Sequence, residues 1–213
     1  AGAGLGGVSV DGTSVTIGAM TRHADVAASK DVADAIPALA VLASGIGDPQ
    51  VRNRGTIGGS VANNDPAADY TAACLGLGAT IKTSTREIAA DDFFTGLFET
   101  ALNDGEVITS VSFPVPDKAA YVKFPNPATR YAMVGVFVSD GSQGIRVAVT
   151  GAGINGVFRE TSFETALSVT FGVAALNGMK GGENQMASDI HAAADYRAHL
   201  VGEIARRAVA ACV

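Results

Sequence analysis

Two prolines separated by a single residue, Pro114 and Pro116, interrupt the chain just past its midpoint. Proline has no backbone N–H and a fixed φ, so a strand that is hydrogen-bonded on both sides cannot run through such a pair. The strand pattern of residues 106–113 therefore has to end here. We predict a domain boundary at this point, between a first domain of residues 1–117 and a second of residues 118–213.

Strand-like and helix-like segments alternate in the first domain, which indicates an α+β architecture. The strands are expected over residues 8–19, broken by the turn Asp11-Gly12, and over 79–83, 86–89 and 106–113. Helices are expected between them, one of them opened by Pro66 with Asp65 as its N-cap. We expect a mixed or antiparallel sheet flanked by helices.

The second domain begins with three strand patterns, residues 120–124, 133–139 and 145–151, and continues with helices. The turn Asp140-Gly141 predicts a hairpin between the second and third strands. A long final helix is expected to run from Ser188 or Tyr196 to Ala211, with Arg197 on a solvated or interface face. We therefore expect a three-stranded antiparallel sheet packed against a helical cluster.

Composition and charge exclude several classes of function. The formal net charge is −6 and no basic run occurs, which argues against binding to nucleic acid or an anionic membrane surface. Cys74 and Cys212 lie far apart and in no metal-like spacing, as is typical of reduced thiols in a cytosolic protein. We found no secretory signal pattern and no apolar run of membrane-spanning length, and we expect a cytoplasmic location.

The segment from Asp48 to Asp69 gives the strongest indication of function. It contains a Gly-Gly pair between hydroxyls, Thr56-Ile57-Gly58-Gly59-Ser60, followed by amides and carboxylates. In a mostly non-helical run, such glycines let backbone N–H groups approach a phosphate, and hydroxyls add donors. Thr56 and Ser60 could bind a pyrophosphate and Asp69 a ribose or ribitol hydroxyl. Taken alone, the pattern leaves nucleotide binding and a structural turn equally open.

Outside this run the sequence offers no convincing nucleophile, metal site or general-base pair. His23, His191 and His199 are scattered, and we expect all three to be exposed. Lys123 stands in an otherwise apolar strand, where a lysine usually faces water. If the chain belongs to an enzyme, we expect a cofactor to carry the chemistry.

The ordered series of motifs resembles the FAD-binding medium subunit of molybdenum hydroxylases, the family of xanthine dehydrogenase and aerobic carbon monoxide dehydrogenase. The likeness covers essentially the whole chain. Its first domain resembles the second FAD-binding (PCMH-type) subdomain of that family. Its motifs are the runs 46–69, 15–21, 90–94, 105–108, 123–128 and the pair Tyr196-Arg197. The family's earlier FAD subdomain, with an Ala-Gly-Gly phosphate loop, has no counterpart in this sequence. Residues 1–7 fall where a flexible connector after that subdomain is expected.

The resemblance also implies site residues, all of them FAD contacts. The loop Thr56, Ile57, Gly58, Gly59 and Ser60 would hold the pyrophosphate. The remaining implied contacts are Ile46, Asp69, Ile108 and Lys123, the last beside the flavin ring. No catalytic residue and no metal ligand is implied in this chain.

By the same resemblance, a molybdenum–pterin cofactor in a large subunit oxidises the substrate and two [2Fe–2S] clusters in a small subunit relay electrons. The FAD of the medium subunit would pass them to a quinone or other acceptor, in a dimer of heterotrimers (a heterohexamer). Partner subunits could attach the complex to the inner face of the membrane. Carbon monoxide is the first expectation for the substrate, followed by xanthine, aldehydes or N-heteroaromatic compounds. A flavin-free scaffold subunit is the alternative from another class. An NAD-binding Rossmann domain is disfavoured, because no βαβ unit carries its glycine fingerprint.

Overall fold

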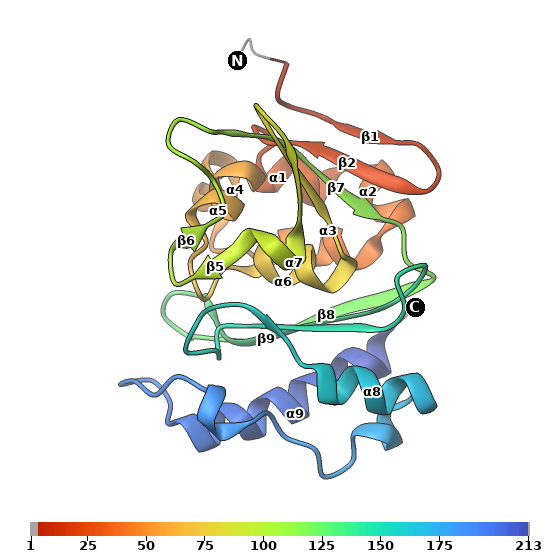
Figure 1. The fold of residues 1–213 in the computed structure, drawn as a ribbon, viewed down its shortest axis with the longest axis vertical. Helices are drawn as coiled ribbons and strands as arrows, with labels where there is room; N and C mark the ends of the chain where they lie inside the picture. Colours follow the sequence, from red (N-terminus) through yellow and green to blue (C-terminus); the bar gives the residue numbers. More distant parts are fainter. Residues whose placement is uncertain (1–3, 213) are drawn as a thin grey trace.

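The computed structural model describes residues 4–212 as two antiparallel sheets with helices between and below them (Figure 1). The first sheet has five strands, in the spatial order β1 (Val8–Val10), β2 (Ser14–Gly18), β7 (Ile108–Pro114), β3 (Thr80–Thr83) and β4 (Glu87–Ala89). In β2 the buried side chains alternate with half-buried ones, because only one face packs on the core. The expected connector, residues 1–7, lies partly outside the described residues.

Helices cover the inner face of this sheet (Figure 1). They are α1 (His23–Ala28), α2 (Lys30–Ala35), α3 (Pro37–Ser44), α4 (Pro49–Arg54), α5 (Ile57–Asn63), α6 (Asp69–Leu77) and the short α7 (Ala90–Phe93). All nine residues of α6 are buried, because this helix lies between the two sheets. A small hairpin of β5 (Phe94–Gly96) and β6 (Glu99–Thr100) follows α7.

The second sheet has the order β11 (Phe158–Arg159), β10 (Arg146–Thr150), β9 (Ala132–Asp140) and β8 (Lys118–Pro125). The three predicted strands and the hairpin are confirmed, and β11 is a fourth strand whose two residues are too few to give a pattern. The outer face is covered by α8 (Thr161–Val169) and α9 (Ala194–Ala211), with the 3-10 turns η1 (Val173–Leu176) and η2 (Glu183–Gln185). Both faces of β10 are covered, so all five of its residues are buried.

The break at the prolines is where the first sheet ends and the second begins, since β7 stops at Pro114 and β8 starts at Lys118. The second sheet is not separate from the first core, however. Tyr121 and Phe137 on its inner face pack in the same hydrophobic cluster as the first sheet and α6. The assignment of 1–117 and 118–213 as domains stays a prediction.

Two local expectations were wrong, one for Arg197 and one for the start of the helix at Pro66. Arg197 is buried rather than solvated, and its guanidinium donates to Asp189 at 2.8 Å and to the Ala187 carbonyl at 2.9 Å, which fixes the loop before α9. The helix expected from Pro66 begins only at Asp69, because the Asp65 carboxylate accepts from the N–H of Ala67 and closes a turn instead of capping a helix.

Candidate functional site

A cavity of about 440 Å³ opens between α4, the first turns of α5 and the loop that joins β8 to β9. Five of the nine predicted FAD contacts line it, and they come from three separate segments. These five are Ile46, Thr56, Gly59, Ser60 and Asp69. Thr129 and Tyr131 from the β8–β9 loop also line it. Its volume falls in the range of small-molecule pockets in proteins.

The glycine pair is helical, which corrects the expectation of a mostly non-helical run. The Thr56 hydroxyl caps α5 by accepting from the N–H of Gly59 at 3.3 Å. Asp48 caps the preceding helix α4 in the same way, accepting from Val51 N at 2.8 Å, with Pro49 in the first turn. The Thr56 cap offsets part of the low helix propensity of the adjacent glycines in α5.

Gly58 is packed closely against the segment that follows β2. Its N–H donates to the Ala19 carbonyl at 2.9 Å, and the N–H of Ile57 donates to the Thr21 carbonyl at 3.0 Å. A Cβ on Gly58 would lie 2.5 Å from the Cβ of Ala19. The N–H groups of Ile57 and Gly58 are therefore not free to form the predicted nest, because they donate to carbonyls of the segment that follows β2. The assignment of both residues as FAD contacts stays a prediction.

The polar groups that do face the cavity share one side of α5. Thr56, Ser60 and Asn63 line it at helical spacing i, i+4 and i+7, and Arg54 at the end of α4 joins them. Within residues 4–212 the structure records no hydrogen bond for the side chains of Arg54, Ser60 or Asn63. Sequence reasoning missed Arg54 and Asn63. A helical reading of residues 56–63 would have placed Asn63 beside the two hydroxyls.

Asp69 lines the cavity and is held in place by two residues of β8. Its carboxylate accepts the Tyr121 hydroxyl and lies 3.1 Å from Nζ of Lys123, which also donates to the Gly45 carbonyl at 2.9 Å. Lys123 is thus held inward and not on a wet face, with its side chain only 11% exposed. Burial raises the pKa of Asp69, while Lys123 and Tyr121 oppose that rise.

Ile108 lies apart from this cavity. It is buried in the core of the first sheet, where it pairs with Thr83 across β7 and β3. The structure therefore brings together five of the predicted contacts at the cavity, places Ile57, Gly58 and Lys123 in contact with its walls, and leaves Ile108 elsewhere.

His23 is a cavity residue that the sequence analysis assigned wrongly to the surface. It is 5% exposed, whereas His191 and His199 are exposed as expected. Its backbone N–H donates to the Gly55 carbonyl at 3.0 Å, next to the β-bridge between Arg22 and Thr56. A single histidine in a short helix carries no sequence signal for this placement, because tertiary contacts with α4 and α5 produce it.

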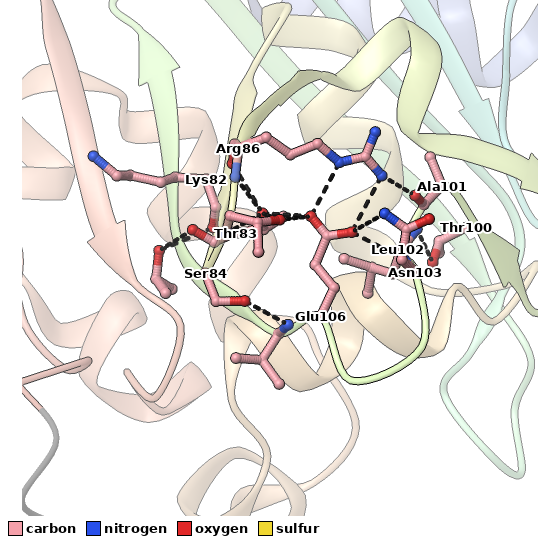
Figure 2. A network of polar contacts seen from close by, with 12 residues as sticks. Lys82, Thr83, Ser84, Arg86, Thr100, Ala101, Leu102, Asn103 and Glu106 are labelled. Carbon is pink, nitrogen blue, oxygen red and sulfur yellow. Dashed lines mark hydrogen bonds and ion pairs between the residues drawn. The ribbon is translucent and has the colours of Figure 1, made fainter.

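A second polar cluster surrounds Glu106 in the first sheet (Figure 2). One carboxylate oxygen accepts from Thr83, Thr85 and Nε of Arg86, at 2.6, 2.8 and 3.1 Å. The other accepts from Nη2 of Arg86 at 3.2 Å and from the N–H and amide of Asn103 at 2.9 and 3.0 Å. These bonds, those from Arg86 first, hold the pKa of Glu106 well below its usual range. The cluster joins two loops and leaves neither carboxylate oxygen free.

Among residues 4–212, no three His, Cys, Asp or Glu side chains come together as a metal site would require. No helix in that stretch combines the length and apolar character needed to cross a bilayer.

Three relatives show how far the likeness to known proteins extends. The carbon monoxide dehydrogenase medium chain of Hydrogenophaga pseudoflava is 32% identical over 96% of this chain and 77% of its own length. The nicotine 6-hydroxylase medium subunit of Paenarthrobacter nicotinovorans is 33% identical over 93% and 75%. The glyceraldehyde dehydrogenase medium chain of Sulfolobus acidocaldarius is 41% identical, but over 57% of this chain and 46% of its own. This chain thus spans about three quarters of the first two relatives and under half of the third.

The fold gives the same result as the sequence. The solved carbon monoxide dehydrogenase of H. pseudoflava superposes on 97% of this chain with a TM-score of 0.86 and covers 77% of its own chain in doing so. Residues 3–116 match the family described as the FAD binding domain in molybdopterin dehydrogenase, a match that covers more than half of the chain. The chain therefore belongs to the FAD-binding domain family of molybdopterin dehydrogenases.

Proposed function

We propose that this chain is the FAD-binding, electron-transferring subunit of a molybdenum hydroxylase complex, and that the cavity beside α5 holds part of the FAD. The observation that carries the proposal is the convergence of Thr56, Ser60 and Asn63 with Arg54 on one cavity of ligand size. Family membership supplies the identity of the cofactor.

The chemistry of the wall fits a flavin dinucleotide. A guanidinium binds phosphate oxygens in a bidentate manner, and Arg54 has no competing hydrogen bond among the described residues. The Ser60 hydroxyl and the Asn63 amide add neutral donors. Ile46 and Tyr131 add apolar surface for a ring system. The lining of the cavity thus combines hydrogen-bond donors with apolar contact.

When bound, FAD supplies the capacity to accept and release electrons singly or in pairs. The chain's own contribution is to bind and orient it. Asp69 and the Gly45 carbonyl fix the Lys123 ammonium next to the cavity, and an ammonium has three donors, so one remains for a ligand. A positive charge there would favour a ligand that becomes more negative on reduction. The assignments of Ile57, Gly58, Asp69, Ile108 and Lys123 as FAD contacts stay predictions.

We further propose partners and a reaction for the complex. The relatives are named medium chains and medium subunits, which supports assembly with a small iron–sulfur subunit and a large molybdenum subunit, as a dimer of heterotrimers. Electrons would pass from [2Fe–2S] clusters through the FAD to a quinone or other acceptor. Coverage by carbon monoxide dehydrogenase in both sequence and fold favours carbon monoxide as substrate. The equal identity to the nicotine 6-hydroxylase subunit favours an N-heteroaromatic hydroxylase as the second candidate.

Flavin analysis of the purified complex tests the cofactor assignment, and an Arg54→Ala variant tests the site. We expect one FAD per copy of this chain by acid extraction and chromatography. Loss of a charge-assisted phosphate contact should weaken FAD binding by about 10- to 100-fold. Arg207→Ala, an exposed arginine on α9, is the matched control and should bind FAD like the wild type.

A complex with intact partner subunits and no flavin would favour the scaffold alternative. Normal affinity in Arg54→Ala would move the phosphate site away from this cavity. Turnover of carbon monoxide against nicotine-like substrates, measured on the same complex, separates the two substrate candidates.

A further inference from the structure

His23 is the least satisfied polar group in the wall of the cavity. Its side chain lines the cavity although the residue is 95% buried, the complement of its 5% exposure. Its Nδ1 atom is fully buried and has no hydrogen-bond partner among the residues described. Because a buried donor without an acceptor is costly, these surroundings disfavour a proton on Nδ1.

The position of the ring is fixed from three sides. The backbone N–H of His23 is bonded to the Gly55 carbonyl, and the imidazole packs on Tyr70 with ring centroids 5.3 Å apart. Nε2 faces Gly55, where a Cβ would lie only 2.5 Å away. Glycine at position 55 therefore leaves room for the Nε2 edge, and Gly55 itself lines the cavity beside Thr56.

The surroundings decide which nitrogen carries the proton. Burial lowers the pKa of His23 to about 4, so the ring is neutral in the physiological range and has one N–H. A proton on Nδ1 would be a buried donor without an acceptor. A proton on Nε2 instead places the donor on the ring edge beside Gly55, and both residues line the cavity.

We infer that His23 is a cofactor-binding residue, whose neutral Nε2–H donates a hydrogen bond to an oxygen of the FAD in the cavity. This inference rests on the proposed function and adds a contact that the glycine-run motif does not contain. A neutral donor adds no second positive charge to a cavity that Arg54 also lines. The other charged groups lining the cavity are Asp65 and Asp69.

The test is FAD binding to the complete complex after its flavin has been removed and titrated back. In His23→Leu, which fills a similar volume without a donor, we expect the dissociation constant to rise about 10-fold. His23→Gln, which keeps a side-chain N–H, should recover most of that loss. The melting temperature of the flavin-free His23→Leu protein should not fall, because the change removes an unpaired buried nitrogen.

The outcomes distinguish a failure of the His23 contact from a failure of the proposed FAD-binding function. If the flavin-free wild type does not take up FAD, the proposed function fails. If the wild type binds and His23→Leu binds equally well, only the role of His23 is overturned. If His23→Leu does not fold, His23→Gln decides: affinity within about 3-fold of the wild type supports the hydrogen bond, and a loss of 10-fold or more in the folded protein contradicts it.

Discussion

The Glu106 cluster and the cavity beside α5 are both polar, but they differ in how completely their groups are paired. Both oxygens of Glu106 accept three hydrogen bonds each from its surroundings (Figure 2). In the cavity wall, Arg54, Ser60 and Asn63 have no recorded partner within residues 4–212, and His23 keeps an orphaned nitrogen. A saturated cluster stabilises the fold, whereas unpaired groups around a cavity are available to a ligand. Complete pairing thus marks Glu106 as a residue that stabilises the fold, and the absence of a recorded partner among the described residues marks Arg54 as a residue available for ligand binding.

The largest expected effect on stability is at Asp69, which is fully paired like Glu106 and also lines the cavity. Asp69→Asn leaves the Lys123 ammonium buried without its counter-charge, and breaking such a pair costs about 3–5 kcal/mol. The free energy of unfolding from denaturant titration measures this. The matched control is Asp140→Asn, which breaks the Lys118–Asp140 pair at the other end of β8. That pair is about one-third exposed, so a cost of about 0–1 kcal/mol is expected.

Equal costs for the two aspartates would mean that Asp69 and Lys123 are solvated in the protein. In that case the two residues would not form a buried ion pair beside the cavity.

The two neighbouring glycines give the next largest effect and separate packing from binding. Gly58→Ala places a methyl group against Ala19 and should lower the free energy of unfolding by about 1–3 kcal/mol. In Gly59→Ala the new Cβ meets only the Thr56 hydroxyl, at 3.1 Å, and the gain in helix propensity of up to about 1 kcal/mol offsets that contact. Gly59→Ala should therefore keep its stability. Because Gly59 lines the cavity, the added methyl group should weaken FAD binding.

Thermal unfolding and FAD titration of both variants check this pair. The reverse pattern, with weakened flavin binding only in Gly58→Ala, would restore the phosphate role of the Gly58 N–H.

The smallest expected effect is at Glu106. Its substitution should change how steeply the melting temperature depends on pH and should leave ligand binding unchanged. Its pKa is lowered in the folded protein from 4.5, so its stabilising contribution is complete above that value and is lost as pH falls toward the folded pKa. Glu106→Gln cannot titrate. Its melting temperature should therefore fall less steeply than that of the wild type between about pH 6 and pH 3. FAD affinity at neutral pH should stay unchanged. Parallel melting curves would show that Glu106 is not held in the ionised form.

Much of the fold follows from local patterns. The prolines end β7, Asp140-Gly141 closes the β9–β10 hairpin and Gly78 ends α6 with φ of 63° as a left-handed cap. The errors share one cause, which is tertiary contact. Arg197 and His23 are polar residues that the loop before α9 and the turn at Gly55 draw into the interior, and no short-range pattern encodes these contacts.

The site was predictable in composition but not in geometry. Thr56 and Ser60 were expected as donors, and they do face the cavity. The helix that presents them does not follow from the glycine pattern, because adjacent glycines disfavour helices, and it is the Thr56 cap that offsets this preference. The period of that helix is what brings Asn63 to the cavity.

The most direct test of the central claim is an experimental structure of the complex with its flavin bound. We predict FAD density in the cavity, with phosphate oxygens within hydrogen-bond distance of Arg54 and Ser60 and Lys123 still bonded to Asp69. Flavin bound elsewhere on the chain, or a cavity filled by protein side chains from a partner subunit, would contradict the account.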